Sequence, residues 1–327
     1  MLRDEVLALL KAREGKPLSG EEMSRALGVS RAAVWKAMES LRDEGYVISS
    51  APRRGYALEG SPDRLSAGEL AGALAGRRVG RALVCLETVD STNNEVKRRA
   101  LAGAADGVAE QKTGGRGRRG RSFVSPAGQG LYLSVLLRPR CPLEEVSALT
   151  AWTAVAVCNA VERVCGVRPG IKWPNDVILD GRKLCGILTE LELEAESAAL
   201  RHVVVGVGIN LTQTAADFGP EVAPVAVSLA QALGRAPRRA EMAAAVLAAL
   251  DELYAAFPAE RAAWLERYRA DCLTLGRTVR LLRAGGEEEA FAEAVDDTFA
   301  LVVRHADGSR EAVSSGEVSV RGLLGYV

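Results

Sequence analysis

The stretch Gly114-Gly115-Arg116-Gly117-Arg118-Arg119-Gly120-Arg121 combines backbone freedom with positive charge, and the segment Leu131-Tyr132-Leu133-Ser134-Val135-Leu136-Leu137 follows shortly after it. Glycine lacks a Cβ, so its N–H groups approach an anion closely, and the planar guanidinium of arginine fits phosphate or carboxylate oxygens in pairs. Gly/Arg-rich tracts are also common in flexible nucleic-acid-binding arms. The apolar, β-prone segment that follows instead predicts a loop between strands of a folded domain.

The composition is that of a globular protein without a dominant charge. The chain has 327 residues, 48% of them hydrophobic, and its 42 Lys and Arg balance 42 Asp and Glu. This length suffices for two or three domains, and any anion binding must come from local patches. No run approaches the ~18 apolar residues that cross a bilayer, and the acidic start Met1–Glu5 does not resemble a signal peptide, so we expect a cytoplasmic protein.

Cysteine and histidine usage argues against metal chemistry. The six cysteines have no C-x-x-C spacing, and several lie within apolar stretches, which predicts reduced core residues and no metal site. The two histidines, His202 and His305, lie on β-like segments. Either could act as a single histidine base, but two histidines in these positions disfavour a Ser/His triad or a His-rich metal site.

Residues 1–60 have the pattern of a small separate domain. Apolar spacing predicts helices over Glu21–Leu27 and Arg31–Glu44, joined by a turn in which Ser30 caps the second helix. The helices are followed by a predicted hairpin, with strands Tyr46–Ile48 and Tyr56–Leu58. This order of elements is typical of a winged helix-turn-helix.

The second helix and the tip of the hairpin carry residues suited to DNA, with base edges and phosphates as the expected contacts. The predicted DNA-binding residues are Ser30, Arg31, Trp35, Lys36, Arg53 and Arg54. Basic and acidic residues are nearly equal in number in this segment. A protein-docking domain therefore remains the alternative.

The remainder of the chain divides at Ser61-Pro62-Asp63 and again near residue 272. Strands such as Ala82–Leu86 and Ala-rich helices over Val146–Val164 and Ala240–Phe257 predict a mixed central domain. Short strands over Thr278–Leu282, Phe299–Val303 and Glu317–Val320 predict a small C-terminal β-barrel, in which Glu287-Glu288-Glu289 forms a solvated turn. The expected domains are 1–62, 63–272 and 273–327.

Two lysines and an aspartate flank a predicted hairpin in the central domain. Lys172-Trp173-Pro174-Asn175-Asp176 precedes one strand, and Lys183 follows the next turn. An ammonium group neutralises a phosphoryl oxygen, and an aspartate accepts N–H bonds or orients an attacking amine. A surface Lys/Asp pair on a hairpin is the simpler alternative.

Two further motifs suit a polar ligand. Asp90-Ser91-Thr92-Asn93-Asn94 begins a helix, where hydroxyl groups either cap the helix or bind a head group. The glycines of Gly206-Val207-Gly208-Ile209-Asn210 permit close approach of a ligand, but this is a weak signal. The sequence has no G-x-x-x-x-G-K-[ST] loop, which disfavours a P-loop ATPase.

In their order, these motifs resemble the family of bifunctional biotin protein ligases that also repress the biotin operon. The resemblance covers nearly the whole chain. It rests on the winged helix and on Ser91–Asn93, Gly115–Arg121, Lys172–Asp176, Lys183–Leu188, Gly206–Asn210 and Gly316–Arg321. It implies a multidomain α+β protein with an N-terminal winged helix-turn-helix, a central domain related to class II aminoacyl-tRNA synthetases and a C-terminal SH3-like β-barrel.

The resemblance also implies a two-step reaction. The carboxylate of biotin attacks the α-phosphate of ATP to give biotinyl-5′-AMP and pyrophosphate, while Mg²⁺ shields the phosphates. A lysine of the biotin carboxyl carrier protein of acetyl-CoA carboxylase then attacks the mixed anhydride. Biotinyl-5′-AMP is further expected to promote a homodimer that binds operator DNA, with no membrane involved.

The resemblance implies roles for the residues at matching positions of this chain. It implies no metal site formed by protein side chains. The implied catalytic residues are Lys183, Arg118 and Asp176. The implied biotin-binding residues are Ser91, Thr92, Asn93, Lys112, Gly115, Arg116, Arg118, Lys183, Gly186 and Gly206. The implied ATP-binding residues are Arg118, Arg119, Arg121, Lys172, Trp173, Asn175, Asp176, Lys183, Asn210 and Arg321.

One position departs from the family pattern. The segment before the loop reads Glu110-Gln111-Lys112-Thr113, so Lys112 occupies the position where the family usually has glutamine. Either Lys112 supplies only a donor to the ureido group, or Gln111 replaces the usual glutamine through a local shift.

Three related functions are alternatives. Lipoate ligases share the central fold and the adenylation chemistry but usually lack the Lys-Trp-Pro-Asn-Asp motif. A transcription factor that senses biotin without catalysis has no need for Lys183 and the full arginine loop. A ligase whose winged helix no longer represses remains open.

Overall fold

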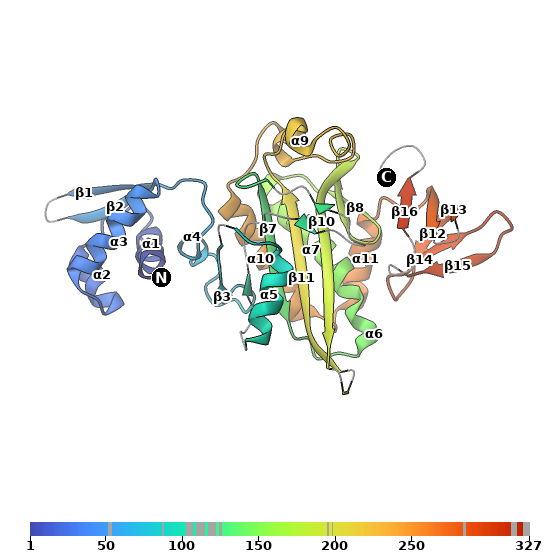
Figure 1. Ribbon diagram of the computed structural model, residues 1–327, viewed down its shortest axis with the longest axis horizontal. Helices are drawn as coiled ribbons and strands as arrows, with labels where there is room; N and C mark the ends of the chain where they lie inside the picture. The colour runs from blue at the N-terminus through green and yellow to red at the C-terminus, as the bar shows by residue number, and fades with distance from the viewer. Residues whose placement is uncertain are drawn as a thin grey trace.

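The computed structural model describes residues 1–51, 54–86, 88–102, 126–194, 196–197, 199–283 and 286–314 and, as backbone, 107–108, 115–116, 122–123 and 319–322. Three units follow one another along the long axis of the molecule (Figure 1). They are a small helical unit at the N-terminus, a central sheet covered by helices, and a C-terminal sheet. No helix among the described residues is both long enough and apolar enough to span a membrane.

The N-terminal unit is a helix-turn-helix followed by a hairpin, as the sequence predicts. Its elements are α1 (Leu2–Ala12), α2 (Gly20–Leu27), α3 (Arg31–Asp43), β1 (Val47–Ala51) and β2 (Gly55–Gly60). Ser30 caps α3, because its Oγ accepts a hydrogen bond from the backbone N–H of Ala33 at 3.2 Å. Val34, Met38 and Leu41 are buried, as predicted, and pack against α1, a helix that the sequence analysis did not predict.

The central domain is built on a five-stranded antiparallel sheet in the order β7-β11-β10-β9-β8. Its strands are β7 (Gly130–Leu137), β8 (Gly170–Lys172), β9 (Asp176–Leu179), β10 (Arg182–Leu193) and β11 (Leu200–Asn210). Every residue of β7 is buried. This explains why its sequence is continuously apolar, with only Tyr132 and Ser134 carrying polar groups.

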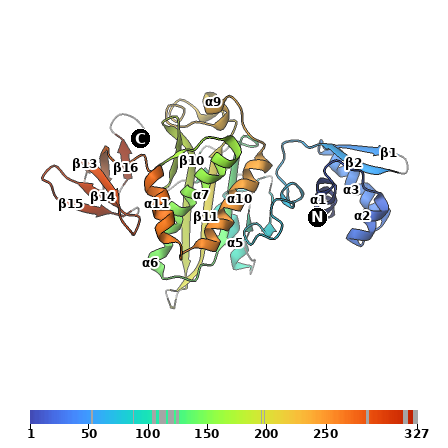
Figure 2. The ribbon, with the colours of Figure 1, turned by 180° about the vertical axis from the view of Figure 1, so that it is seen from behind.

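Helices cover both faces of this sheet. In front lies α5 (Thr92–Leu101) (Figure 1), and behind it lie α7 (Ala148–Cys165), α10 (Arg239–Ala256) and α11 (Arg261–Asp271) (Figure 2). The predicted helices of the second layer are confirmed within a few residues. Trp152 of α7 and Trp264 of α11 stack with ring centroids 4.8 Å apart, which ties this layer together.

Several short elements connect the main ones. The short helices are α4 (Ala67–Leu70), α6 (Leu143–Val146), α8 (Ala215–Phe218) and α9 (Leu229–Leu233). The short strands are β3 (Ala82–Leu83), β4 (Gly107–Val108), β5 (Gly115–Arg116) and β6 (Ser122–Phe123). The strand predicted over Ala82–Leu86 therefore ends earlier, at Leu83.

The C-terminal unit is a second five-stranded antiparallel sheet, in the order β15-β14-β13-β12-β16. Its strands are β12 (Thr278–Arg283), β13 (Gly286–Val295), β14 (Leu301–Arg304), β15 (Arg310–Val313) and β16 (Ser319–Gly322). The prediction of a turn at Glu287–Glu289 is wrong, because these residues pair with β12. This end of β13 is exposed, so a strand can hold three glutamates there, and Arg280 pairs with Glu287 at 3.4 Å.

A buried carboxylate joins the N-terminal unit to the central domain. The side chain of Glu69 on α4 is only 1% exposed and forms ion pairs with Lys11 of α1 at 2.7 Å and with Arg238, beside α10, at 3.4 Å. The backbone of Gly68 lies so close to α1 that an added Cβ would be 2.7 Å from the carbonyl oxygen of Asp4. Both contacts seat α4 tightly between the two units.

The two histidines should influence stability in opposite directions as the pH changes. His202 is 1% exposed on β11, and burial lowers its pKa, although Glu192 on β10 opposes this shift. His305 forms a hydrogen bond with Glu288 at 2.7 Å, which raises its pKa.

Below about pH 6.5, the unfolded chain takes up a proton on His202 more readily than the folded protein does, so stability is lost as the pH falls. We expect His202→Gln to reduce the fall in the free energy of unfolding between about pH 7 and pH 5, measured by urea denaturation. His305→Gln should make the fall steeper, because a raised pKa contributes stability on the acid side. Equal pH slopes in wild type and His202→Gln would contradict the assignment.

Candidate functional site

One face of the central sheet, the face that α5 covers in part, collects most of the predicted site residues that the structure describes. Paired residues on neighbouring antiparallel strands share a face, and so do residues two positions apart on one strand. Two rows of paired residues cross this face: Ser134–Gly206–Leu188, and Tyr132–Gly208–Gly186–Asp176. Asn93 at the start of α5 contacts the first row.

Glycines leave the middle of this face without side chains. Gly206 and Gly208 lie on β11, and Gly208 pairs directly with Gly186 on β10. These three residues, which we call the glycine floor, place bare backbone between the start of α5 and Asp176 on β9. A ligand can lie directly on the strands at such a place.

The start of α5 forms one end of the site and is polar although it is buried. Ser91, Thr92 and Asn93 are 2%, 2% and 4% exposed. Ser91 occupies the N-cap position, but its side chain makes no capping hydrogen bond. The simple capping role therefore does not account for its hydroxyl group.

Asn93 is held by the sheet on all sides of its amide. Its Nδ2 donates to the carbonyl oxygen of Leu188 at 3.2 Å and to Oε2 of Glu190 at 2.7 Å. Its Oδ1 accepts a hydrogen bond from Ser134 at 2.5 Å. A Cβ on Gly206 would lie 2.2 Å from this oxygen, so only glycine allows Asn93 to dock here.

Lys183 and Asp176 form the other end of the site, and the structure brings them together as the hairpin spacing suggests. Nζ of Lys183 lies 2.6 Å from Oδ1 of Asp176. The register of β10 against β9 shifts between Lys183 and Cys185, as in a β-bulge, which re-aims the side chains at this point. The backbone of Lys183 is fixed on its other side, since its N–H donates to Val225 at 2.8 Å and its carbonyl accepts from Val227 at 3.0 Å.

Three further predicted residues are occupied by contacts within the protein. The indole N–H of Trp173 donates to the carbonyl of Phe299 at 3.0 Å, which links this turn to the C-terminal unit. Asn175 donates to the carbonyl of Ile187 at 2.7 Å, and Asn210 donates to that of Val227 at 3.1 Å. Asn210 also donates to the carbonyl of Lys183 at 3.3 Å. Lys172, in the motif of Trp173 and Asn175, is buried.

The arginine loop contributes little to the described geometry. Lys112, Arg118, Arg119 and Arg121 lie outside the described residues. Gly115 and Arg116 are described as backbone in β5, which pairs with β6, and Arg321 as backbone in β16.

Cys185 lies beside the site, and burial raises the pKa of its thiol, so it is protonated and a poor nucleophile.

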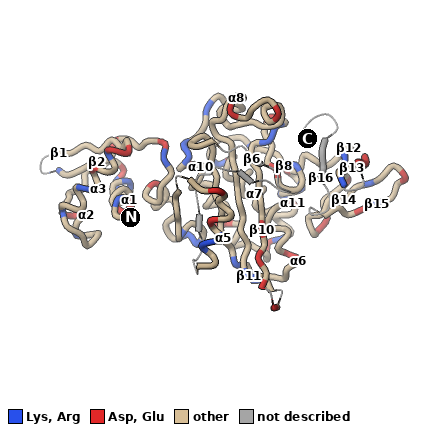
Figure 3. Tube along the Cα trace, in the orientation of Figure 1, with Lys and Arg blue, Asp and Glu red and all other residues tan. Residues whose placement is uncertain are grey.

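The predicted DNA-binding face is exposed. Arg31, Trp35 and Lys36 project from α3, and Trp35 is 54% exposed. Arg54 is exposed at the hairpin tip, whereas Arg53 lies outside the described residues. Acidic residues lie among the basic ones on this unit (Figure 3), and Glu21 pairs with Arg31 at 2.9 Å.

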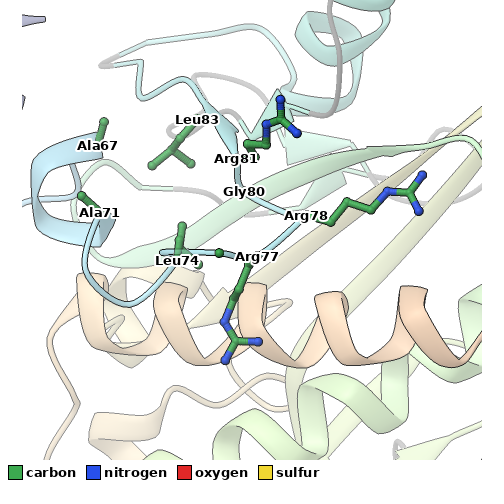
Figure 4. Close-up of a pocket in the computed structure, with 9 residues that line it drawn as sticks. Ala67, Ala71, Leu74, Arg77, Arg78, Gly80, Arg81 and Leu83 are labelled. Carbon is green, nitrogen blue, oxygen red and sulfur yellow. The ribbon is translucent and has the colours of Figure 1, made fainter.

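Among the described residues, cavities also lie away from this face of the sheet. One, of about 640 Å³, is bordered by Arg77, Arg78 and Arg81, whose side chains point in three different directions (Figure 4). Arg78 lies over the ring of Tyr254, so these arginines do not converge on an anion. The other, of about 700 Å³, lies between the N-terminal unit and the central domain and has residues of both in its wall.

Sequence reasoning missed Ser134 and Glu190. Neither belongs to a motif, yet both bond to the start of α5. The available signal was weak: Ser134 interrupts an otherwise apolar strand. A hydroxyl group buried in a strand needs a partner, which here is Asn93.

Comparison with known proteins gives matches along most of the chain. Family models match for an HTH domain over residues 3–57, the biotin/lipoate A/B protein ligase family over 85–210 and the biotin protein ligase C-terminal domain over 274–321. The bifunctional ligase/repressor BirA of Bacillus subtilis (strain 168) is 34% identical over 322 residues, covering 96% of this chain and 97% of the relative. The BirA protein of Escherichia coli (strain K12) is 31% identical over 320 residues, covering 97% and 96%.

A solved structure also matches. The biotin protein ligase from Aquifex aeolicus in complex with biotin and ATP aligns with a TM-score of 0.64 at 29% identity, covering 74% of this chain and 99% of that one.

The close approach of Asn93 to Gly206 predicts the effect of a single methyl group. Gly206→Ala must displace the start of α5, and we expect it to lower the free energy of unfolding by about 1 to 3 kcal/mol in urea denaturation. Gly72→Ala is the matched control, because nothing lies within 4 Å of its added Cβ. Equal stability of the two variants would show that Asn93 does not need the glycine.

Proposed function

Because this chain belongs to the family of bifunctional biotin protein ligases and biotin repressors, we propose that the glycine floor holds biotin between the start of α5 and Lys183. The protein is an ATP-dependent biotin protein ligase that also acts as a DNA-binding repressor. The observation that carries the proposal is the placement of a buried polar helix start and a lysine–aspartate pair at opposite ends of one bare strip of sheet.

The start of α5 suits the ureido ring of biotin. Ser91 and Thr92 offer hydroxyl groups in a buried setting, and a urea supplies both N–H donors and a carbonyl acceptor. The absence of a capping bond from Ser91 leaves its hydroxyl group to the ligand. From there, the aliphatic chain of biotin runs over Gly206, Gly208 and Gly186 towards Lys183.

Lys183 serves the adenylation step. The carboxylate of biotin attacks the α-phosphate of ATP, the bond to pyrophosphate breaks, and negative charge builds up on the phosphoryl oxygens. A fixed cationic donor at that position is typically worth about 3 to 4 kcal/mol of transition-state stabilisation. The ion pair with Asp176 and the backbone bonds to Val225 and Val227 keep Lys183 in place before the reaction.

The second step is aminolysis of biotinyl-5′-AMP. The amine of an acceptor lysine on a biotin carboxyl carrier protein attacks the carbonyl carbon, AMP leaves, and the amide forms. Asp176 lies at the same end of the floor as Lys183 and positions the incoming amine by accepting an N–H bond.

Mg²⁺ bound to ATP would supply positive charge that shields the phosphates. The arginines of Gly115–Arg121, and Lys112 before them, supply cationic donors to biotin and the adenylate. Trp173, Asn175 and Asn210 support the nucleotide end through the backbone bonds they make. A cytoplasmic location, where ATP and operator DNA are both present, supports this proposal.

The finer fold assignment follows the same family. We assign the central domain, residues 63–272, to the fold of class II aminoacyl-tRNA synthetases and residues 273–327 to an SH3-like barrel. The antiparallel sheets of both units support these assignments. Residues 1–62 form the winged helix-turn-helix, which contacts operator DNA through α3 and the hairpin tip.

Repression requires two copies of the DNA-binding domain on two half-sites. Biotinyl-5′-AMP acts as corepressor by favouring the dimer. Linkage then requires that operator binding favours the ligand-bound dimer.

Lys183→Gln tests the ligase. We expect the rate of biotin-dependent pyrophosphate exchange into ATP to fall about 100-fold or more, and a carrier domain incubated with biotin and ATP to stay at its unmodified mass. Arg201→Gln is the matched control, since it removes a cation from an ion pair with Glu192 on the same pair of strands, away from the site. An unmodified carrier with the wild-type protein would refute the ligase, and full activity of Lys183→Gln would refute the role of the lysine.

Sedimentation tests the regulatory proposal. Addition of biotin and ATP should shift the protein towards a dimer, and the same ligands should tighten binding to promoter DNA of biotin synthesis genes, measured by fluorescence anisotropy. An unchanged sedimentation coefficient would contradict the corepressor mechanism and leave the ligase intact. A ligand-induced dimer that fails to bind this DNA would identify a ligase that no longer represses.

A further inference from the structure

Behind Thr92 runs a chain of hydrogen-bonded polar side chains that no catalytic step uses, and its inner members Asn93 and Ser134 are buried. It begins at Glu190 on β10 and continues through Asn93 to Ser134 on β7, which ends 2.7 Å from the hydroxyl oxygen of Thr92. Ser134 is completely buried. Lys97 balances the carboxylate of Glu190 at 2.6 Å.

The orientation of the Asn93 amide is fixed by its partners. Its Nδ2 faces a backbone carbonyl oxygen and a carboxylate oxygen, and both accept hydrogen bonds. Rotating the amide by half a turn would set its oxygen against two other acceptors. Oδ1 therefore points to Ser134.

The positions of the protons then follow in order. Oδ1 of Asn93 only accepts, so the single proton of the Ser134 hydroxyl group is donated to it. With that proton committed, the contact between Ser134 and Thr92 requires Thr92 to donate. The hydroxyl oxygen of Thr92 is left with lone pairs and no proton for a ligand.

We propose that Ser134, Asn93 and Glu190 are positioning residues that set Thr92 as a hydrogen-bond acceptor, so that the site selects a ligand presenting an N–H group at this point. This inference rests on the proposed function, in which a urea N–H of biotin meets Thr92. It changes the role of Asn93 from a ligand contact to the central member of the chain. A ligand with only a carbonyl or ether oxygen at this point receives no hydrogen bond from Thr92. Its binding free energy is weakened by the desolvation penalty of an unpaired buried acceptor.

A purely structural role would be simpler, because the same bonds also dock α5 on the sheet. The two roles differ in one respect. If Ser134 acts through the hydroxyl group of Thr92, its removal must matter only while that hydroxyl group is present. A double-mutant cycle measures this dependence.

The experiment is a cycle of Ser134→Ala and Thr92→Val, with the Kd of biotin measured by isothermal titration calorimetry on the full chain. Valine keeps the shape of threonine and removes the hydroxyl group. We expect each single variant to weaken biotin binding about tenfold. In the Thr92→Val background, Ser134→Ala should change the Kd by less than about twofold.

Effects that multiply in the double variant would overturn the proposal and leave Ser134 with a docking role alone. The Kd of ATP should not change in either single variant, and a parallel rise in both Kd values would likewise indicate general loosening of the site. Failure of the wild type to bind biotin would instead refute the proposed function itself.

Glu190→Gln provides a second route if Ser134→Ala does not fold. The charge of Lys97 attracts the amide oxygen of the new glutamine, so the amide nitrogen faces Nδ2 of Asn93 and breaks the chain. Its effect on biotin binding should also vanish in the Thr92→Val background. Glu192→Gln is the matched control, because Glu192 lies two residues further along β10 on the same face and contacts Arg201 and His202 instead of Asn93. Persistence of the Glu190→Gln effect without the threonine hydroxyl would overturn the proposal.

Discussion

A polar helix start buried on a β-sheet needs a partner for each donor and acceptor, and this requirement fixes the position of α5. Unpaired buried polar groups cost about 1 to 3 kcal/mol each. Asn93 meets the requirement with bonds to Leu188, Glu190 and Ser134, and Gly206 leaves room for it. The hydroxyl groups of Ser91 and Thr92 are thereby held over the glycine floor. The rest of the site is arranged around this anchored end.

The opposite end is held by backbone hydrogen bonds together with a few side-chain contacts. A shift in strand register aims Lys183 at Asp176, and bonds to Val225 and Val227 fix it there. Trp173 ties the neighbouring turn to the C-terminal unit through Phe299. The Lys172–Asp176 motif therefore also joins two domains.

Regular patterns in the sequence were enough for most of the framework. The helix-turn-helix, the apolar β7 strand and the helices α7 and α10 follow from apolar periodicity, which depends only on neighbouring positions. The acidic run Glu287–Glu289 predicts a turn but forms part of strand β13, which pairs with β12. This end of the strand is exposed, so its carboxylates remain in water and the strand tolerates them. Helix α1 was not predicted, although Val6, Leu7 and Leu10 lie at helical spacing and are buried.

The sequence by itself determined the family, the order of domains and the residue types near Lys183 and Asp176, because motifs and their spacing are local and can be compared directly. Only the tertiary structure decided what Asn93, Ser134, Glu190 and Trp173 do. Asn93 was assigned to the ligand by its place in a motif, yet its amide is used within the protein. Ser134 and Glu190 do not belong to any motif of the sequence. Their roles arise from hydrogen bonds between residues far apart in the chain, and such pairings exist only once the sheet and α5 have come together.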